Sequence, residues 1–188
     1  MRLVLVCHGA TAATRKAAFP VDEPLEASAV EQARTLGAAL PDSNYSWTSP
    51  ALRARQTALA LSLDANPQPA LAECDYGRWA GRRLKDVSAE EPEAVETWLR
   101  DFEAAPHGGE SLAVLFARVS GWLDKIMIGE GQVIAVTHAS VIRAAVIHLL
   151  RAPRESFWQI DIEPLSVVDL TGVGQSRRLR VVPRGLFA

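Results

Sequence analysis

The sequence has few cysteines and no long apolar run. Cys7 and Cys74 are the only cysteines among 188 residues, too few for a disulfide framework, so a reducing compartment is expected. The apolar run at residues 3–6 is too short for a signal-peptide core, and no stretch reaches the roughly 20 residues of a membrane span. These absences predict a cytoplasmic protein without a membrane partner.

Neither sign of charge dominates the sequence. Twenty basic and 22 acidic residues leave a formal net charge of −2. Such a chain has no general attraction for nucleic acid, so no nucleic-acid partner is expected, and a site for an anionic ligand must come from a local cluster of cations. The length and the hydrophobic content of 48% suit one globular domain, which we expect to span residues 1–188.

Short buried strands alternate with helices along the chain. Apolar runs predict buried strands at residues 3–6 and 132–137, and weaker strand signals occur at 45–48 and 69–73. Helical spacing of apolar residues predicts helices at about 24–40, 50–63, 111–129 and 139–150. This alternation predicts an α/β fold with a doubly wound, mostly parallel sheet flanked by helices on both faces.

Two further segments complete the predicted architecture. Late strands near residues 165–170 and 179–182, with a turn around Gly172 and Gly174, predict a C-terminal hairpin at the sheet edge. The irregular segment at about 82–108 predicts a short helical lid insertion. We expect its aromatic side chains to pack the lid onto the body of the protein.

Polar side chains follow the predicted strands. His8, Ser49, Glu73 and His138 each stand just after one of them. Ligands of doubly wound sheets bind beyond the carboxyl ends of the strands, so these side chains are expected to share one rim. A single histidine there is most often a loop or core residue, but two of the four histidines together favour a site.

Five segments resemble the motifs of the histidine phosphatase superfamily, the phosphoglycerate-mutase-like proteins. Residues 6–11 (VCHGAT) resemble the Arg-His-Gly-Glu-Thr signature, and residues 49–58 (SPALRARQTA) resemble the Ser-Pro-Leu-x-Arg-Ala-x-Gln-Thr-Ala segment. Residues 71–81 (LAECDYGRWAG), 109–111 (GES) and 136–143 (VTHASVIR) resemble the remaining motifs, in the family order. Each motif alone is a weak signal, but the five together make a chance resemblance hard to sustain.

The resemblance implies a chemistry for four residues. His8 would attack a phosphoryl group and become a phosphohistidine. Arg53 would hold two phosphoryl oxygens, and His138 would donate to a third. Glu73 would protonate the leaving oxygen and then activate the hydrolytic water. No metal and no organic cofactor is implied.

The phosphate loop departs from the family pattern. Cys7 replaces the motif arginine, Ala10 the motif glutamate, and Thr14 the usual asparagine. Loss of one preorganised charge contact typically costs about 3–4 kcal/mol in the transition state. The expected phosphate-binding residues are His8, Arg53, His138, Ala139, Thr14 and Cys7, and the possible compensating charges are Arg15, Lys16, Arg82 and Arg83.

The expected function is therefore that of a phosphatase. It would hydrolyse a phosphorylated small molecule, or a phosphoprotein, and Cys7 would make it slow or unusually specific. The alternative is a catalytically impaired pseudo-phosphatase that binds a phosphorylated ligand or protein partner. The short lid favours hydrolysis over the phosphoglycerate mutase reaction. The sequence leaves open the physiological substrate, the oligomeric state and any redox role of Cys7 and Cys74.

Overall fold

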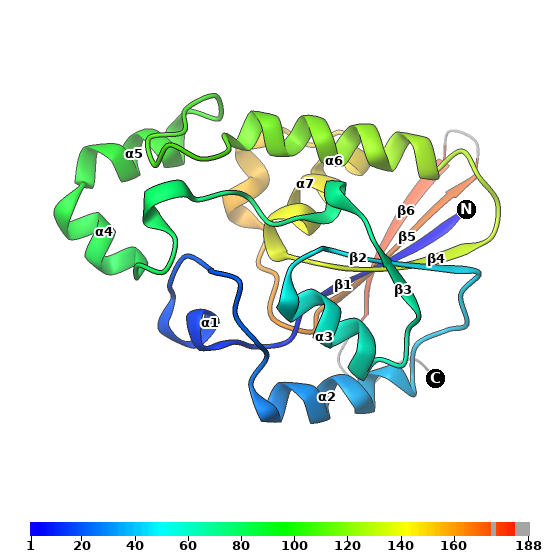
Figure 1. The fold of residues 1–188 in the computed structure, drawn as a ribbon. Coiled ribbons are helices and arrows are strands. Elements are labelled where there is room, and N and C mark those ends of the chain that lie inside the picture. The colour runs from blue at the N-terminus through cyan, green and yellow to red at the C-terminus, as the bar shows by residue number, and fades with distance from the viewer. Residues whose placement is uncertain (174–175, 183–188) are drawn as a thin grey trace.

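The computed structural model describes residues 1–173 and 176–182. Its strands form one six-stranded sheet (Figure 1). The strand order is β3-β2-β4-β1-β5-β6. Strands β3, β2, β4 and β1 are parallel, and β5 and β6 form an antiparallel hairpin beside β1. The strands are β1 Arg2–Cys7, β2 Tyr45–Thr48, β3 Ala65–Pro67, β4 Gln132–Thr137, β5 Val167–Val173 and β6 Ser176–Val182. The predicted α/β fold, mostly parallel with a hairpin at the edge, is confirmed.

Helices cover both faces of the sheet. They are α1 Ala12–Lys16, α2 Ala27–Gly37, α3 Leu52–Ala60, α4 Leu84–Glu90, α5 Pro92–Arg100, α6 Leu112–Ile126 and α7 Ala139–Leu150. Side chains of the central strand β1 alternate between two cores. Leu3 and Leu5 pack in the cluster that α6 and α7 cover, whereas Val4 and Val6 pack in the cluster that α2 and α3 cover (Figure 1). Because both faces of β1 are buried, the strand reads as a continuous apolar run.

Two elements differ from the sequence predictions. The predicted strand at 69–73 is wrong, because the third strand is β3 and a 3₁₀ turn at Pro69–Leu71 follows it. Pro69 has no N–H to give to a strand ladder, and Gln68 caps the turn by accepting from the N–H of Ala70. Helix α1 was not predicted, because only a reciprocal capping box of Thr11 and Thr14 marks its five residues. The predicted hairpin turn falls partly elsewhere: Gly172 lies inside β5, and Gly174 lies outside the described residues.

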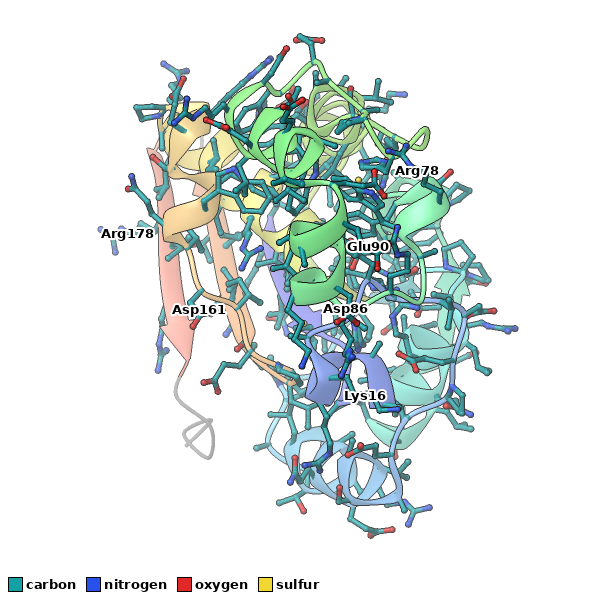
Figure 2. All side chains as sticks on the ribbon, turned by 90° about the vertical axis from the view of Figure 1, so that its left-hand side faces the viewer. Lys16, Arg78, Asp86, Glu90, Asp161 and Arg178 are labelled. Atoms are coloured by element: carbon teal, nitrogen blue, oxygen red, sulfur yellow. The ribbon has the colours of Figure 1, made fainter. Side chains whose placement is uncertain are left out.

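The predicted lid segment carries two helices, α4 and α5, at one end of the sheet (Figure 1). Figure 2 shows this end face-on, with the charged side chains of Arg78, Asp86 and Glu90 on its surface. Trp79 and Trp98 are buried beneath these helices, with ring centroids 5.7 Å apart, and both contact Phe19. The aromatic side chains therefore pack the segment onto the body.

Two glycines allow a close backbone crossing beside this segment. A Cβ atom on Gly77 would lie 2.3 Å from the carbonyl oxygen of His107, and one on Gly109 would lie 2.1 Å from that of Asp75. Gly77 also has a positive φ of 47°. The N–H of Glu110 donates to the carbonyl of Asp75 at 2.8 Å, which closes the crossing. The crossing fixes the chain immediately after Glu73.

We expect Gly109→Ala to destabilise the fold by about 1–3 kcal/mol, the usual cost of forcing extra atoms into packed structure. Gly121→Ala is the matched control, because Gly121 is exposed in α6 and a Cβ there meets nothing within 4 Å. Helix propensity predicts that this control gains about 0.5–1 kcal/mol. Urea unfolding measures both, and equal stability of the two variants would refute the crossing.

Candidate active site

The parallel strands deliver polar side chains to one rim of the sheet. His8 follows β1, Ser49 follows β2 and His138 follows β4, and backbone hydrogen bonds extend the ladders to His8 and to Ser49. The imidazole centroids of His8 and His138 are 5.0 Å apart, with an interplanar angle of 64°. Arg53 enters from the first turn of α3, and Glu73 from the loop after the 3₁₀ turn. The structure thus brings together the four residues for which the family resemblance implies a chemistry: His8, Arg53, Glu73 and His138.

The imidazole of His8 has a defined tautomer. Its Nδ1 lies 2.7 Å from the carbonyl oxygen of Gly9, which can only accept, so Nδ1 carries the proton. Its Nε2 accepts from Nε of Arg53 at 3.3 Å. Burial, and secondarily the charge of Arg53, lowers the pKa of His8 to about 4, although the bond to Gly9 works in the opposite direction. His8 therefore presents an unprotonated Nε2 at neutral pH.

Arg53 is a buried cation that bridges the two imidazoles. Its side chain donates to Nε2 of His8 at 3.3 Å, to Nδ1 of His138 at 3.2 Å and to the carbonyl of Val21 at 2.8 Å. The residue is 3% exposed, and no carboxylate of the described residues lies within 4.0 Å of its guanidinium. A buried charge is costly without a counterion, so the arrangement is suited to an anion.

His138 is also neutral, and Glu73 stands beside it. Nε2 of His138 lies 2.8 Å from Oγ of Ser49, and Nδ1 of His138 lies 3.5 Å from Oε2 of Glu73. Burial lowers the pKa of His138 well below its usual value, and the nearby His8 and Arg53 act in the same direction. The other oxygen of Glu73 accepts from the N–H of Cys74 at 2.9 Å and from the hydroxyl of Ser140. These bonds leave Oε2 directed toward the imidazole.

Several positioning residues were not found from the sequence. Arg118 donates to both carboxylate oxygens of Glu110 and to the carbonyls of Ala70 and Ala72, which holds the chain leading to Glu73. Glu110 belongs to the Gly-Glu-Ser motif, so its partner could have been sought, but nothing in the sequence marks Arg118 as that partner.

Thr57 links the first histidine loop to α3. Its hydroxyl accepts from the N–H of Gly9 at 3.0 Å and donates to the carbonyl of Arg53 at 2.7 Å. Thr57 lies in the segment that resembles Gln-Thr-Ala, so the sequence marked the motif, but it did not predict the hydrogen bond between Thr57 and Gly9.

Two cavities open over these residues. A cavity of about 120 Å³ lies over His8, and a wider one of about 350 Å³ lies outside it, over Arg53. Pro20 and Glu73 line both, so the two are parts of one site. Arg53 is the only arginine or lysine that lines either cavity in the part of the chain that the structure describes.

The remaining predicted phosphate-binding residues, Cys7, Ala139 and Thr14, line the inner cavity with His8, whereas Arg53 lines the outer cavity and His138 lines neither. Cys7 is 2% exposed there, and Ala139 begins α7, so the N-terminus of this helix faces the same space. The hydroxyl of Thr14 lines the cavity but is already bonded to the backbone of Thr11, as acceptor and as donor. Thr14 is thus held as the N3 partner of Thr11 in the capping box of α1, which its sequence position did not reveal.

The four possible compensating charges do not reach the site. Arg15 pairs with Glu26, Arg82 with Glu90 and Glu91, and Arg83 with Asp86, while Lys16 is exposed on α1 (Figure 2 labels Lys16). None of them lines either cavity. Carboxylates that lie closer hold these guanidinium groups, so the structure contradicts the expectation that they replace the arginine missing at position 7.

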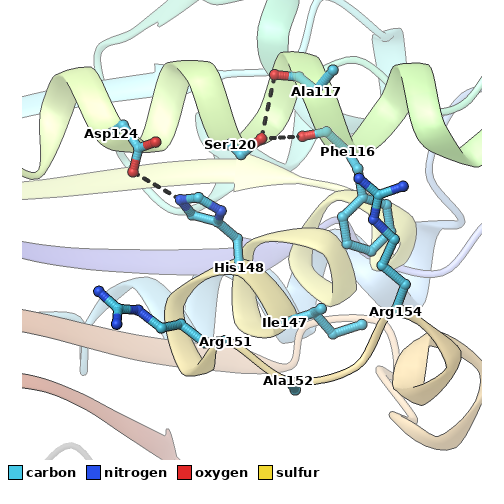
Figure 3. Close-up of a pocket in the computed structure, with 9 residues that line it drawn as sticks. All are labelled: Phe116, Ala117, Ser120, Asp124, Ile147, His148, Arg151, Ala152 and Arg154. Carbon is cyan, nitrogen blue, oxygen red and sulfur yellow. Dashed lines mark hydrogen bonds and ion pairs between the residues drawn. The ribbon is translucent and has the colours of Figure 1, made fainter.

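A further cavity of about 460 Å³ lies between α6 and the C-terminal end of α7 (Figure 3). His148 turns toward Asp124 there, with its Nε2 2.7 Å from the carboxylate, and Arg151 and Arg154 stand at the rim. This cavity shares no residue with the two over His8.

The described residues hold no cluster of three side chains suited to a metal ion. None of the helices in residues 1–173 and 176–182 is long and apolar enough to cross a membrane.

Comparisons with known proteins show which chains this one resembles. The chain is 33% identical over 180 residues to a 2,3-bisphosphoglycerate-dependent phosphoglycerate mutase of Rhizobium rhizogenes, covering 85% of this chain and 84% of that one. It is 30% identical over 174 residues to an adenosylcobalamin/alpha-ribazole phosphatase of Salmonella typhimurium, covering 87% and 86%. Matches to mycobacterial proteins, 32% identical, span only 38% of those proteins' length.

A solved structure shares the fold over nearly the whole chain. The crystal structure of a putative alpha-ribazole-5′-P phosphatase from Escherichia coli superposes with a TM-score of 0.85 at 26% identity, covering 97% of this chain and 95% of that one. The sequence model of the histidine phosphatase superfamily (branch 1) matches residues 3–183. With the paired histidines and the arginine in place, the chain belongs to the histidine phosphatase superfamily.

Proposed function

We propose that the protein is a phosphomonoesterase that hydrolyses a small phosphorylated molecule through a phosphohistidine on His8. The observation that carries the proposal is the buried guanidinium of Arg53, which has no carboxylate of the described residues within 4.0 Å and lies between two neutral imidazoles. A phosphoryl dianion entering the inner cavity would supply the missing charge. The relatives named as phosphatases support the same class of reaction.

The first chemical step uses the lone pair of His8. Nε2 attacks phosphorus, and the bond from phosphorus to the ester oxygen breaks in line with it. Gly9 keeps the proton on Nδ1 and accepts its hydrogen bond as the ring becomes positively charged. Arg53 transfers its donors from the imidazoles to the phosphoryl oxygens, which develop charge in the transition state.

Glu73 and His138 complete the cycle. Glu73 lines both cavities, so its carboxyl group can protonate the leaving oxygen at their junction. The carboxylate then removes a proton from the water that attacks phosphorus and releases His8. Once Arg53 turns to the dianion, neutral His138 can adopt the tautomer in which Nε2 accepts from the hydroxyl of Ser49 and Nδ1 carries the ring proton, and Nδ1 then donates to a phosphoryl oxygen.

The single cation at the site favours a second candidate, a pseudo-phosphatase that binds a phosphorylated ligand without turnover. Cys7 supplies no charge where the family motif has arginine, and no other lysine or arginine of the described residues lines the inner or the outer cavity. Binding needs only Arg53 and the helix N-terminus, whereas rapid turnover needs more compensation of transition-state charge. A mutase is less well supported, because the segment at 82–108 is short.

His8→Asn tests the nucleophile. Asparagine keeps a donor for the carbonyl of Gly9 but has no nucleophilic nitrogen, so hydrolysis of para-nitrophenyl phosphate should fall by at least about 10³-fold. Rapid acid-free quenching of the wild type should trap an alkali-stable phosphoryl group on the peptide containing His8, read by mass spectrometry. Wild-type turnover without this adduct would contradict a phosphohistidine, and binding without turnover would support the pseudo-phosphatase.

Cys7→Arg tests the cost of the missing cation. A guanidinium at position 7 would enter the cavity over His8, and we expect kcat for para-nitrophenyl phosphate to rise by about 10-fold or more. Cys7→Met is the control, because it adds length without charge and should not raise kcat. A folded Cys7→Arg that is no faster than Cys7→Met would show that position 7 does not limit turnover.

The lowered pKa of His8 predicts how stability depends on pH. In the unfolded chain His8 binds a proton below about pH 6.5, whereas in the folded protein it binds a proton only below about pH 4. The contribution of neutral His8 is therefore complete above pH 6.5 and is lost as pH falls toward 4. Urea unfolding from pH 7 to 4.5 should show wild type losing stability relative to His8→Asn, with a slope approaching about 1.4 kcal/mol per pH unit. A pH-independent difference would mean that His8 titrates normally in the fold.

A further inference from the structure

The outer cavity has more acidic than basic side chains in its lining. It lies outside the phosphate pocket, so on the proposed reaction it receives the alcohol part of the ester. Its lining combines Arg53 and Glu73 with two more carboxylates, Asp22 and Asp75, and with the phenol of Tyr76. The rest of its wall is apolar or small: Pro20, Val21, Pro50, Ala51, Cys74 and Ala80.

Backbone hydrogen bonds fix the two outer carboxylates. Oδ1 of Asp22 accepts from the N–H of Leu52, the first residue of α3, at 2.7 Å. Oδ1 of Asp75 accepts from the N–H of Gly77 at 2.9 Å. Both residues are exposed, and neither carboxylate has an arginine or lysine within 4.0 Å in the described residues. No basic side chain of the described residues therefore offsets either carboxylate, and each has a second oxygen available to a ligand.

Basic side chains of the neighbouring segment do not offset these charges. Arg78 and Arg82 are both held by Glu91, and neither lines the cavity. Among the residues that the structure describes, Arg53 is the one cation in the lining, and the phosphoryl group would take its charge. Tyr76 adds no cation, and burial raises the pKa of its phenol, which stays neutral.

We infer that the outer cavity selects a leaving group that carries a positive charge, as in the phosphomonoester of an amino alcohol, and rejects one that carries a carboxylate or a second phosphate. Asp22 and Asp75 are the specificity-determining residues. This inference rests on the proposed function for the direction in which the ester lies. An ammonium in the outer cavity would meet the carboxylates of Asp22 and Asp75, whereas a carboxylate there would meet like charge from both, with the charge of Arg53 already taken by the phosphoryl group.

Three small esters that differ in one terminal group test the inference. Phosphoethanolamine, ethyl phosphate and 2-phosphoglycolate place an ammonium, a methyl and a carboxylate at nearly the same distance from phosphorus. Binding is measured by isothermal titration calorimetry at pH 8 on His8→Asn, which cannot turn the esters over. We expect phosphoethanolamine to bind about 10-fold or more tightly than 2-phosphoglycolate, with ethyl phosphate between them.

The double variant Asp22→Asn, Asp75→Asn removes both charges and keeps both backbone acceptors, so the fold should be retained. In the same His8→Asn background it should reduce the preference for phosphoethanolamine over 2-phosphoglycolate to within about 3-fold. Asp64→Asn, an exposed aspartate that lines neither cavity, should leave the preference unchanged.

Equal binding of the three esters, tighter binding of 2-phosphoglycolate, or a preference that survives in the double variant would overturn the inference. A failure of the proposed function is distinguishable, because it shows as absent turnover of para-nitrophenyl phosphate by wild type while the order of affinities is unaffected.

Discussion

The site depends on one buried positive charge. The guanidinium of Arg53 is almost fully enclosed, and in the described residues it contacts two imidazoles and a carbonyl instead of a carboxylate. Burial lowers the pKa of His8 and of His138, and the charge of Arg53 acts in the same direction, so both imidazoles stay unprotonated. The same charge leaves the cavity suited to an anion, and the proposed attack by His8 on a bound phosphoryl group rests on this arrangement.

The rest of the fold holds this arrangement in place. Parallel strands set the two histidines side by side, and Asp22 and Thr57 tie α3, and with it Arg53, to the surrounding loops. On the other side, Arg118 and the glycine crossing hold the chain around Glu73. Fixing four side chains in advance matters because preorganised groups need no reorganisation when charge develops.

Much of this could be predicted from the sequence. Continuous apolar runs marked β1 and β4, and His8, Ser49 and His138 after strands marked the rim where the strands end. Glu73 reaches the same rim although the strand predicted before it is a 3₁₀ turn. The sequence did not reveal β3, because three residues with an asparagine and a proline carry no apolar pattern. It also did not reveal Arg118, or the pairing that keeps Arg82 and Arg83 away from the site, since contacts between distant side chains depend on tertiary packing. Thr14 lines the inner cavity, but its hydroxyl donates to the carbonyl of Thr11, a local hydrogen bond that the sequence analysis did not predict.

The most direct test of the central claim is a crystal structure with vanadate, which mimics the phosphoryl group in the transition state of its transfer. The account predicts vanadium in the inner cavity, with Nε2 of His8 at an apical position and Arg53 donating to the equatorial oxygens. Vanadate bound between α6 and α7 at Arg151 and Arg154, with the guanidinium of Arg53 still on the two imidazoles, would contradict it.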